Sequence, residues 1–96
     1  MRPPPVSAER LRRETFTAPA ERVARFTAVV LRRVEPAAAV RVLDVGCGTG
    51  EQLLALAAAL SRAGLTGLDI SEPSIRRARA AAAARGVAGR ISFHAG

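Results

Sequence analysis

The sequence predicts an α/β fold built on a parallel sheet. Short, apolar, β-branched stretches alternate with longer amphipathic stretches along the 96 residues. A glycine-rich turn at 46–50 joins the first short stretch to the next helical pattern, and Asp69 ends the second short stretch. Strands that alternate with helices are joined by right-handed crossovers, which keep the strands parallel. A chain of this length makes at most one small domain.

The first 36 residues are expected to form an N-terminal helical extension. Three prolines at 3–5 predict an extended lead-in, and Ser7 is a plausible cap for a short charged turn or helix through about Glu14. A firmer helix begins near Pro19, because proline is favoured in the first turn, and ends at Glu35-Pro36. Its apolar face has the spacing of one helix side and comprises Val23, Phe26, Val30, Leu31 and Val34.

Residues 37–96 are expected to form the domain proper. Residues 40–45 are apolar or β-branched except for Arg41 and Asp44, which predicts a nearly buried strand. After the glycine-rich turn, a helix is predicted from about Glu51 to Arg62 and should bury Leu53, Leu56, Ala57 and Leu60. Gly64 is predicted to be its left-handed C-terminal cap.

The second half of this domain repeats the same order. Residues 65–70 are predicted to form a strand. Ser71 is predicted to cap a helix that has Pro73 in its first turn and ends near Arg85, before Gly86. That helix should bury Ile75, Ala78 and Ala82, and residues 90–94 should form a third strand.

Charge and composition narrow the classes of partner. All 15 basic residues are arginine and the formal net charge is +7, which can attract nucleic acid. Most of these arginines fall on the polar sides of the helical patterns, with no aromatic residues between them. We therefore expect a solvated surface and no nucleic-acid partner, although the positive charge does not exclude such a partner. Cys47 and His94 form no metal-ligand pattern, so no metal is expected. The N-terminus lacks a signal peptide pattern and no apolar run is long enough for a membrane span, which predicts a cytoplasmic protein.

The turn at 46–50 and Asp69 together predict a binding site for an adenosine-containing cofactor. A strand, a glycine-rich turn and a helix in succession place free backbone N–H groups at the carboxyl edge of the sheet. Gly46, Gly48 and Gly50 remove side chains where a ligand passes close to the main chain. A carboxylate at the end of the neighbouring strand can accept hydrogen bonds from both hydroxyls of a ribose.

The spacing of the glycines favours one such cofactor over another. A dinucleotide fingerprint requires glycine at 46, 48 and 51, but position 51 is Glu51. Asp44 precedes the first glycine by two residues, where it would repel a pyrophosphate and favour a cation. S-adenosylmethionine has no phosphate and carries a sulfonium and an ammonium group, so these residues suit it better than NAD.

Residues 43–50, Leu-Asp-Val-Gly-Cys-Gly-Thr-Gly, resemble motif I of the class I, Rossmann-like, S-adenosylmethionine-dependent methyltransferases. Residues 67–71 with Ile75, Ala78 and Arg79 resemble the second-strand motif of that family and its following helix, and residues 91–96 resemble its third strand. The resemblance implies a three-layer fold with a seven-stranded sheet, of which this chain holds the N-terminal half in the strand order 3-2-1. It also implies methyl transfer to an N, O, C or S atom of an acceptor, which we expect to be a small molecule.

The resemblance further implies the role of each site residue. Asp44 would serve the amino end of the cofactor, the glycines its methionine and ribose, Asp69 the ribose hydroxyls and Ile70 the adenine. The expected cofactor-binding set is Asp44, Gly46, Cys47, Gly48, Thr49, Gly50, Asp69 and Ile70. Each residue has a structural alternative: a tight turn for the glycines, a loop tie for Asp44, a helix cap for Asp69 and a core position for Ile70. Cys47 and His94 are not expected to act as nucleophile or base, and no catalytic residue is assigned.

Two rival functions are also compatible with these residues. One is a truncated, non-catalytic cofactor-binding fragment, and the other is an NAD(P)-binding half of an oxidoreductase. Under the first, the domain is incomplete at its C-terminus, and the first strand has an unpaired apolar edge. We then expect these 96 residues alone to be poorly stable and without turnover. The acceptor and the oligomeric state do not follow from the sequence.

Overall fold

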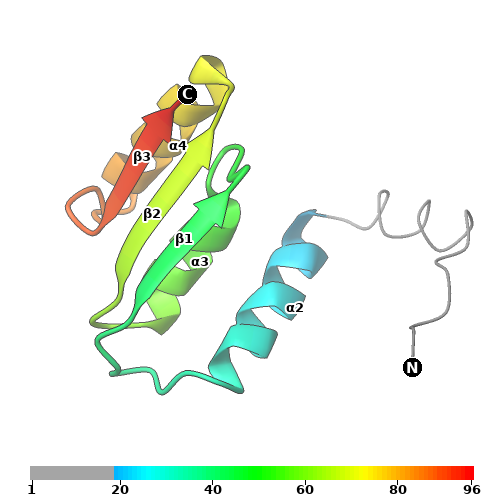
Figure 1. Cartoon of the computed structure of the whole chain (residues 1–96), viewed down its shortest axis with the longest axis vertical. Helices are drawn as coiled ribbons and strands as arrows, with labels where there is room; N and C mark the ends of the chain where they lie inside the picture. The colour runs from blue at the N-terminus through cyan, green and yellow to red at the C-terminus, as the bar shows by residue number, and fades with distance from the viewer. Residues whose placement is uncertain (1–18) are drawn as a thin grey trace, which may run out of the picture.

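The computed structural model describes residues 19–96, which alternate helices with strands as the sequence predicts. The elements shown in Figure 1 are α2 (Pro19–Leu31), β1 (Arg41–Val45), α3 (Glu51–Ala59), β2 (Gly64–Asp69), α4 (Glu72–Ala84) and β3 (Ile91–Ala95). The turn or helix expected at 7–14 lies outside the described residues. The helix expected from Pro19 is confirmed, although it ends at Leu31, before the predicted stop at Pro36.

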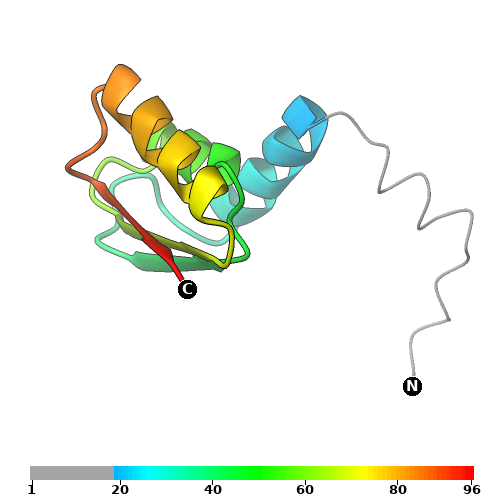
Figure 2. The same ribbon diagram turned by 90° about the horizontal axis from the view of Figure 1, so that it is seen from above.

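The three strands form one parallel sheet in the order β1-β2-β3, which confirms the predicted topology. Asp44 of β1 pairs with Gly67 of β2, and Leu68 of β2 pairs with His94 of β3. Figure 2 shows the helices on one face of this sheet, with α2 beside α3. Residues 19–96 therefore form two layers, a sheet and one helical layer. The carboxyl ends of all three strands meet at one edge.

The core lies between the sheet and helices α3 and α4. The largest fully buried side chains are Leu53, Leu56, Leu60 and Ile75, and Phe93 of β3 is 4% exposed. The predicted apolar faces of α3 and α4 are confirmed, and Leu54 is buried in addition. Leu54 is buried because α2 packs on α3, so α3 has apolar neighbours on two sides. No helix within residues 19–96 combines the length and the hydropathy needed to cross a membrane.

The prediction that β1 is nearly buried is wrong for the described residues. Leu43 is 61% exposed and Val45 is 74% exposed, whereas Val42, next to Leu43, packs against the core. Alternate residues of a strand point to opposite faces, and here the helices cover one face only. The apolar stretch therefore reflects one buried face and one open face at the edge of the sheet.

The prediction that Gly64 caps α3 in a left-handed conformation is also wrong. Gly64 is the first residue of β2, and the residue that follows the last turn of α3 is Leu60 in an extended conformation. The carbonyl groups at this helix end are instead bound by Arg90, whose guanidinium donates to the carbonyl oxygens of Ala57 and Leu60. A cation at a helix C-terminus also interacts favourably with the helix dipole.

The start and end of α4 agree with prediction. The Ser71 hydroxyl accepts a hydrogen bond from the Ser74 N–H at 3.3 Å, and Pro73 lies in the first turn. Gly86 follows the helix with φ 72°, a left-handed conformation that glycine adopts without steric cost. The Ser71 cap fixes the direction of the chain immediately after the end of β2.

Candidate functional site

The turn at 46–50 connects the carboxyl end of β1 to the first turn of α3. Its three glycines all have positive φ, at 77° for Gly46, 57° for Gly48 and 82° for Gly50. The N–H groups of Gly46 and Cys47 both donate to the Leu68 carbonyl oxygen, at 2.7 and 2.9 Å. These bonds hold the turn against the end of β2, so that both motifs of the sequence meet at one place.

The three glycines face different surroundings. A Cβ atom on Gly46 or on Gly48 would have no heavy atom within 4 Å, so both face open space. A Cβ atom on Gly50 would lie 2.9 Å from the Phe93 ring and 3.1 Å from the Ala78 Cβ atom. Gly50 is therefore needed for packing, whereas Gly46 and Gly48 leave room beside the main chain.

Asp69 connects the two motifs directly. Its Oδ2 atom accepts a hydrogen bond from the Gly48 N–H at 2.9 Å, and its Oδ1 atom accepts one from the Ser71 N–H at 2.8 Å. These two donors lower the pKa of Asp69, because they stabilise the ionised carboxylate. The N-terminal cap of α4 is Ser71, so the alternative that Asp69 is itself the helix cap is wrong.

Asp44 lies beside this carboxylate on the neighbouring strand. Its Oδ2 atom is buried and has no hydrogen-bond partner among the described residues. Burial raises the pKa of Asp44, and the nearby negative charge of Asp69 raises it further. A buried carboxylate oxygen without a donor is costly, and the cost would be offset by a ligand that brings a positively charged donor.

We predict that Asp44→Asn stabilises the ligand-free protein at neutral pH. Since the folded-state pKa of Asp44 is raised above its ordinary value of 3.8, ionisation at neutral pH opposes folding. The gain should shrink as the pH falls through the pKa of Asp44 and vanish well below pH 3.8, where the carboxyl is protonated in both states. Urea unfolding of both proteins across this range measures the difference. Glu35→Gln, at an exposed acid, is the control. An equal gain at all pH values would contradict the charge argument.

Cys47 and Thr49 are the two residues of the turn that are not glycine. Cys47 is buried, and burial followed by the charges of Asp44 and Asp69 raises the pKa of its thiol. A raised pKa disfavours the thiolate, which agrees with the expectation that Cys47 is no nucleophile. The Thr49 hydroxyl donates a hydrogen bond to the Glu51 carboxylate at the start of α3.

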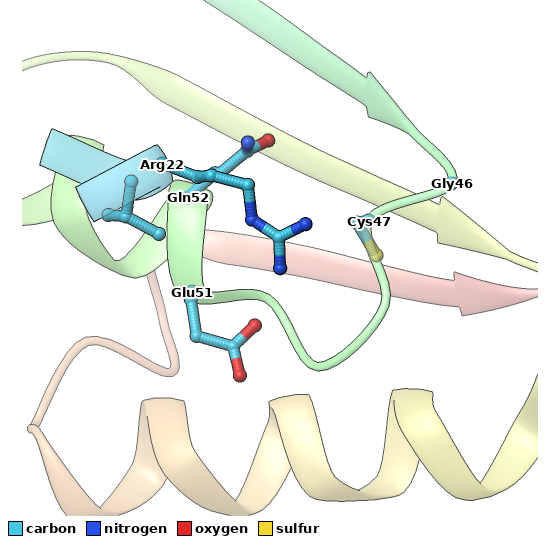
Figure 3. Close-up of a pocket in the computed structure, with 6 residues that line it drawn as sticks. Arg22, Gly46, Cys47, Glu51 and Gln52 are labelled. Carbon is cyan, nitrogen blue, oxygen red and sulfur yellow. The ribbon is translucent and has the colours of Figure 1, made fainter. Parts of the chain in front are cut away.

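Two cavities flank the turn, and Gly46 lines both. One, of about 240 Å³, lies at the carboxyl ends of the strands and is lined by Val45, Gly46, Leu68, Asp69, Ile70 and Gly96. The other, of about 220 Å³, lies on the helical side and is lined by Arg22, Val23, Gly46, Cys47, Glu51 and Gln52 (Figure 3). Ile70 is 90% exposed at the first cavity, so the alternative that it is a core residue is wrong.

Two residues that bear on the site were not identified from the sequence. A Cβ atom on Gly67 would lie 2.8 Å from Cys47 Sγ and 2.8 Å from Leu53 Cδ1, so Gly67 lets the turn pack against β2. Arg22 of α2 lines the helical cavity. The glycine within a strand was a usable signal for close approach, whereas nothing in the local pattern distinguished Arg22 from the other arginines.

The fold and the turn define a class of protein. A parallel sheet with a glycine-rich turn after its first strand and an acid at the end of the second is a Rossmann-like arrangement. Residues 36–96 match the family described as methyltransferase domain, and the chain belongs to this family.

Curated relatives with different acceptors resemble the same region. The chain is 41% identical over 63 residues to the ribosomal RNA small subunit methyltransferase C of Klebsiella pneumoniae, covering 66% of this chain and 18% of the relative. It is 41% identical over 68 residues to the nocamycin O-methyltransferase of Saccharothrix syringae, covering 70% of this chain and 24% of the relative. The chain thus spans less than a quarter of the length of either relative.

Solved structures show the same fold. A SAM-dependent methyltransferase from Geobacter sulfurreducens, solved with S-adenosyl-L-homocysteine, aligns with a TM-score of 0.67 at 35% identity, over 82% of this chain and 29% of that one. The [4+2]-cyclase SpnF aligns with a TM-score of 0.65 at 35% identity, over 75% of this chain and 26% of that one. SpnF is named for a cyclisation and not for methyl transfer.

Proposed function

We propose that this chain binds S-adenosyl-L-methionine at the carboxyl edge of β1 and β2, as the cofactor-binding part of a methyltransferase. The observation that carries the proposal is the buried Asp44 Oδ2 atom, which has no hydrogen-bond partner in the described part of the chain, near the open space at Gly46 and Gly48. A cationic ligand that passes close to the main chain fits both features. When bound, this cofactor supplies an activated methyl group on a positively charged sulfur.

Different residues at this edge are proposed to bind different parts of S-adenosyl-L-methionine. Asp44 is proposed to receive its ammonium end, and Gly46 and Gly48 to lie against its chain. Asp69 is proposed to accept hydrogen bonds from the ribose hydroxyls through the lone pairs that its two backbone donors leave free. The exposed Ile70 side chain is proposed to pack against the adenine. Cys47, Thr49 and Gly50 are proposed to shape the turn.

The same contacts argue against a dinucleotide. A pyrophosphate binds to free N–H groups at the turn and at the helix N-terminus. Here the Gly48 N–H is bound by the Asp69 carboxylate, and the Glu51 carboxylate stands in the first turn of α3. The Asp44 carboxylate beside them would also repel phosphate.

The acceptor is proposed to be a small molecule. Of the phenylalanine side chains in residues 20–96, Phe93 is buried and Phe26 is partly buried against the core, so neither stands fully exposed as a platform on which a base could stack. Because one relative is named a ribosomal RNA methyltransferase, nucleic acid is the competing proposal for the acceptor. The likeness to a cyclase supports a further alternative, cofactor binding without methyl transfer. Assay with labelled cofactor against RNA and small-molecule acceptors separates the three.

The domain division is proposed to fall at residue 36, with an N-terminal helical extension at 1–36 and the cofactor-binding domain at 37–96. The beginning of the family match at residue 36 supports this division. The end of α2 at Leu31 and the following turn also support it.

Titration calorimetry on the full chain tests the choice of cofactor. We expect S-adenosyl-L-homocysteine to bind and NADH not to bind, because the edge offers carboxylates and a turn amide that is already bonded. Adenosine is the control for the shared part of both ligands and should bind more weakly than S-adenosyl-L-homocysteine. Binding of NADH without binding of S-adenosyl-L-homocysteine would overturn the proposal.

A further inference from the structure

The cavity on the helical side of the turn has walls from two parts of the chain. The turn and α3 contribute Gly46, Cys47, Glu51 and Gln52, and α2 contributes Arg22 and Val23. Figure 3 shows the Arg22 side chain extending from α2 toward the turn, with its guanidinium between Glu51 and Cys47. A residue outside the family match at 36–96 therefore lines the space beside the glycine-rich turn.

This cavity is continuous in its lining with the cavity at the strand ends. Gly46 lines both, and a Cβ atom on Gly46 would meet no heavy atom within 4 Å. We infer that a ligand with its ribose at Asp69 extends along Gly46, where no side chain stands in its way, and ends beside Arg22.

The charges on the walls are of both signs. Arg22 is exposed on α2 and forms no ion pair with another residue of the described part of the chain. The carboxylate of Glu51 also lines this cavity, and the Asp44 oxygen that has no partner among the described residues belongs to β1, two residues before Gly46. A cation and a carboxylate on the walls of one small cavity suit a zwitterion, and an α-amino acid group is a zwitterion.

We propose that Arg22 binds the carboxylate of the methionyl end of the cofactor. This inference rests on the proposed cofactor site and assigns the carboxylate to α2, whereas the ammonium falls to Asp44. Guanidinium and carboxylate form charge-assisted, often bidentate hydrogen bonds. Because Arg22 belongs to α2, cofactor binding also adds a bond between α2 and the rest of the fold.

Decarboxylated S-adenosylmethionine, which keeps the ammonium and lacks the carboxylate, separates this role from a structural one. On the full chain, Arg22→Gln is expected to weaken binding of S-adenosylmethionine by about tenfold or more, the range of a lost charge-assisted bond. Its affinity for the decarboxylated cofactor should be unchanged. Arg22→Lys should retain part of the affinity, because it keeps the charge without the bidentate geometry.

Arg25→Gln is the matched control, since Arg25 lies on the same helix and lines a groove with Arg22, Phe26 and Val29, but does not line the cavity beside the glycine-rich turn. It should leave both affinities unchanged. Hydrogen exchange provides a second measurement, because S-adenosylmethionine should slow exchange in α2 of the original protein and not of Arg22→Gln.

The outcomes distinguish this inference from the proposed function. If Arg22→Gln weakens both ligands equally, or neither, Arg22 does not bind the carboxylate and the inference is overturned, while the cofactor site stands. If the original protein binds neither ligand, the proposed function fails and the inference fails with it.

Discussion

Asp69→Ala is expected to reduce cofactor affinity by about tenfold or more, since it removes a charged acceptor. The same substitution leaves the Gly48 and Ser71 N–H groups without their acceptor. The turn at 46–50 then loses one of its bonds to the end of β2, so the ligand-free protein should also lose stability. The two backbone bonds therefore add a loss of stability to the expected loss of affinity.

The pH dependence separates the contribution of Asp69 to stability from its contribution to binding. Its pKa is lowered in the folded state, so its stabilising effect is complete above the ordinary value of 3.8 and is lost as the pH falls through the folded pKa. The stability difference between the original protein and Asp69→Ala should therefore be constant near neutral pH and shrink below pH 3.8. Calorimetry and thermal unfolding on the same samples provide both quantities.

Glu72→Ala is the control for Asp69→Ala. It removes an exposed acid three residues away, in the first turn of α4, without a bond to the glycine-rich turn. It should leave cofactor affinity unchanged. Unchanged affinity in Asp69→Ala, together with lowered stability, would mean that Asp69 serves only to hold the turn.

Gly50→Ala is expected to cause the largest loss of stability of any substitution in the turn. Its φ of 82° is strained for alanine, and the new Cβ atom would lie 2.9 Å from the Phe93 ring. Together the left-handed conformation and the overpacking cost about 2–4 kcal/mol. Urea unfolding measures this loss directly.

Gly48→Ala and Gly89→Ala are matched controls for Gly50→Ala. Gly48 also has a positive φ but faces open space, so alanine there should cost only the strain, about 1–2 kcal/mol. Gly89 has neither constraint and should tolerate alanine. Equal losses at Gly50 and Gly48 would show that Phe93 moves aside without cost. A double-mutant cycle with Phe93→Leu tests that contact independently.

Much of the fold was predictable because local chemistry determines it. The cap at Ser71, the proline at Pro73 and the glycine at Gly86 bound α4 through interactions among residues close in sequence. The same is true of the alternation of strands and helices, which follows from the period of the apolar residues. The parallel sheet then follows from the alternation.

The burial of β1 and the cap of α3 were predicted wrongly for a shared reason. Whether Leu43 and Val45 are covered depends on which face of the sheet the helices occupy. Which group binds the last carbonyls of α3 depends on Arg90, which reaches Ala57 from 33 residues away. Neither contact leaves a periodic pattern in the local sequence.

The sequence by itself determined that this protein has a glycine-rich turn after one strand and an aspartate after the next, with helices of defined start and end. Only the tertiary structure decided what each residue does there. It directed Gly46 and Gly48 to open space and Gly50 against Phe93, bound Asp69 to the Gly48 amide, left the Asp44 oxygen without a partner among residues 19–96 and brought Arg22 to the turn. The physical reason is that conformation and capping depend on neighbours in the chain, whereas clash, burial and charge pairing depend on neighbours in space.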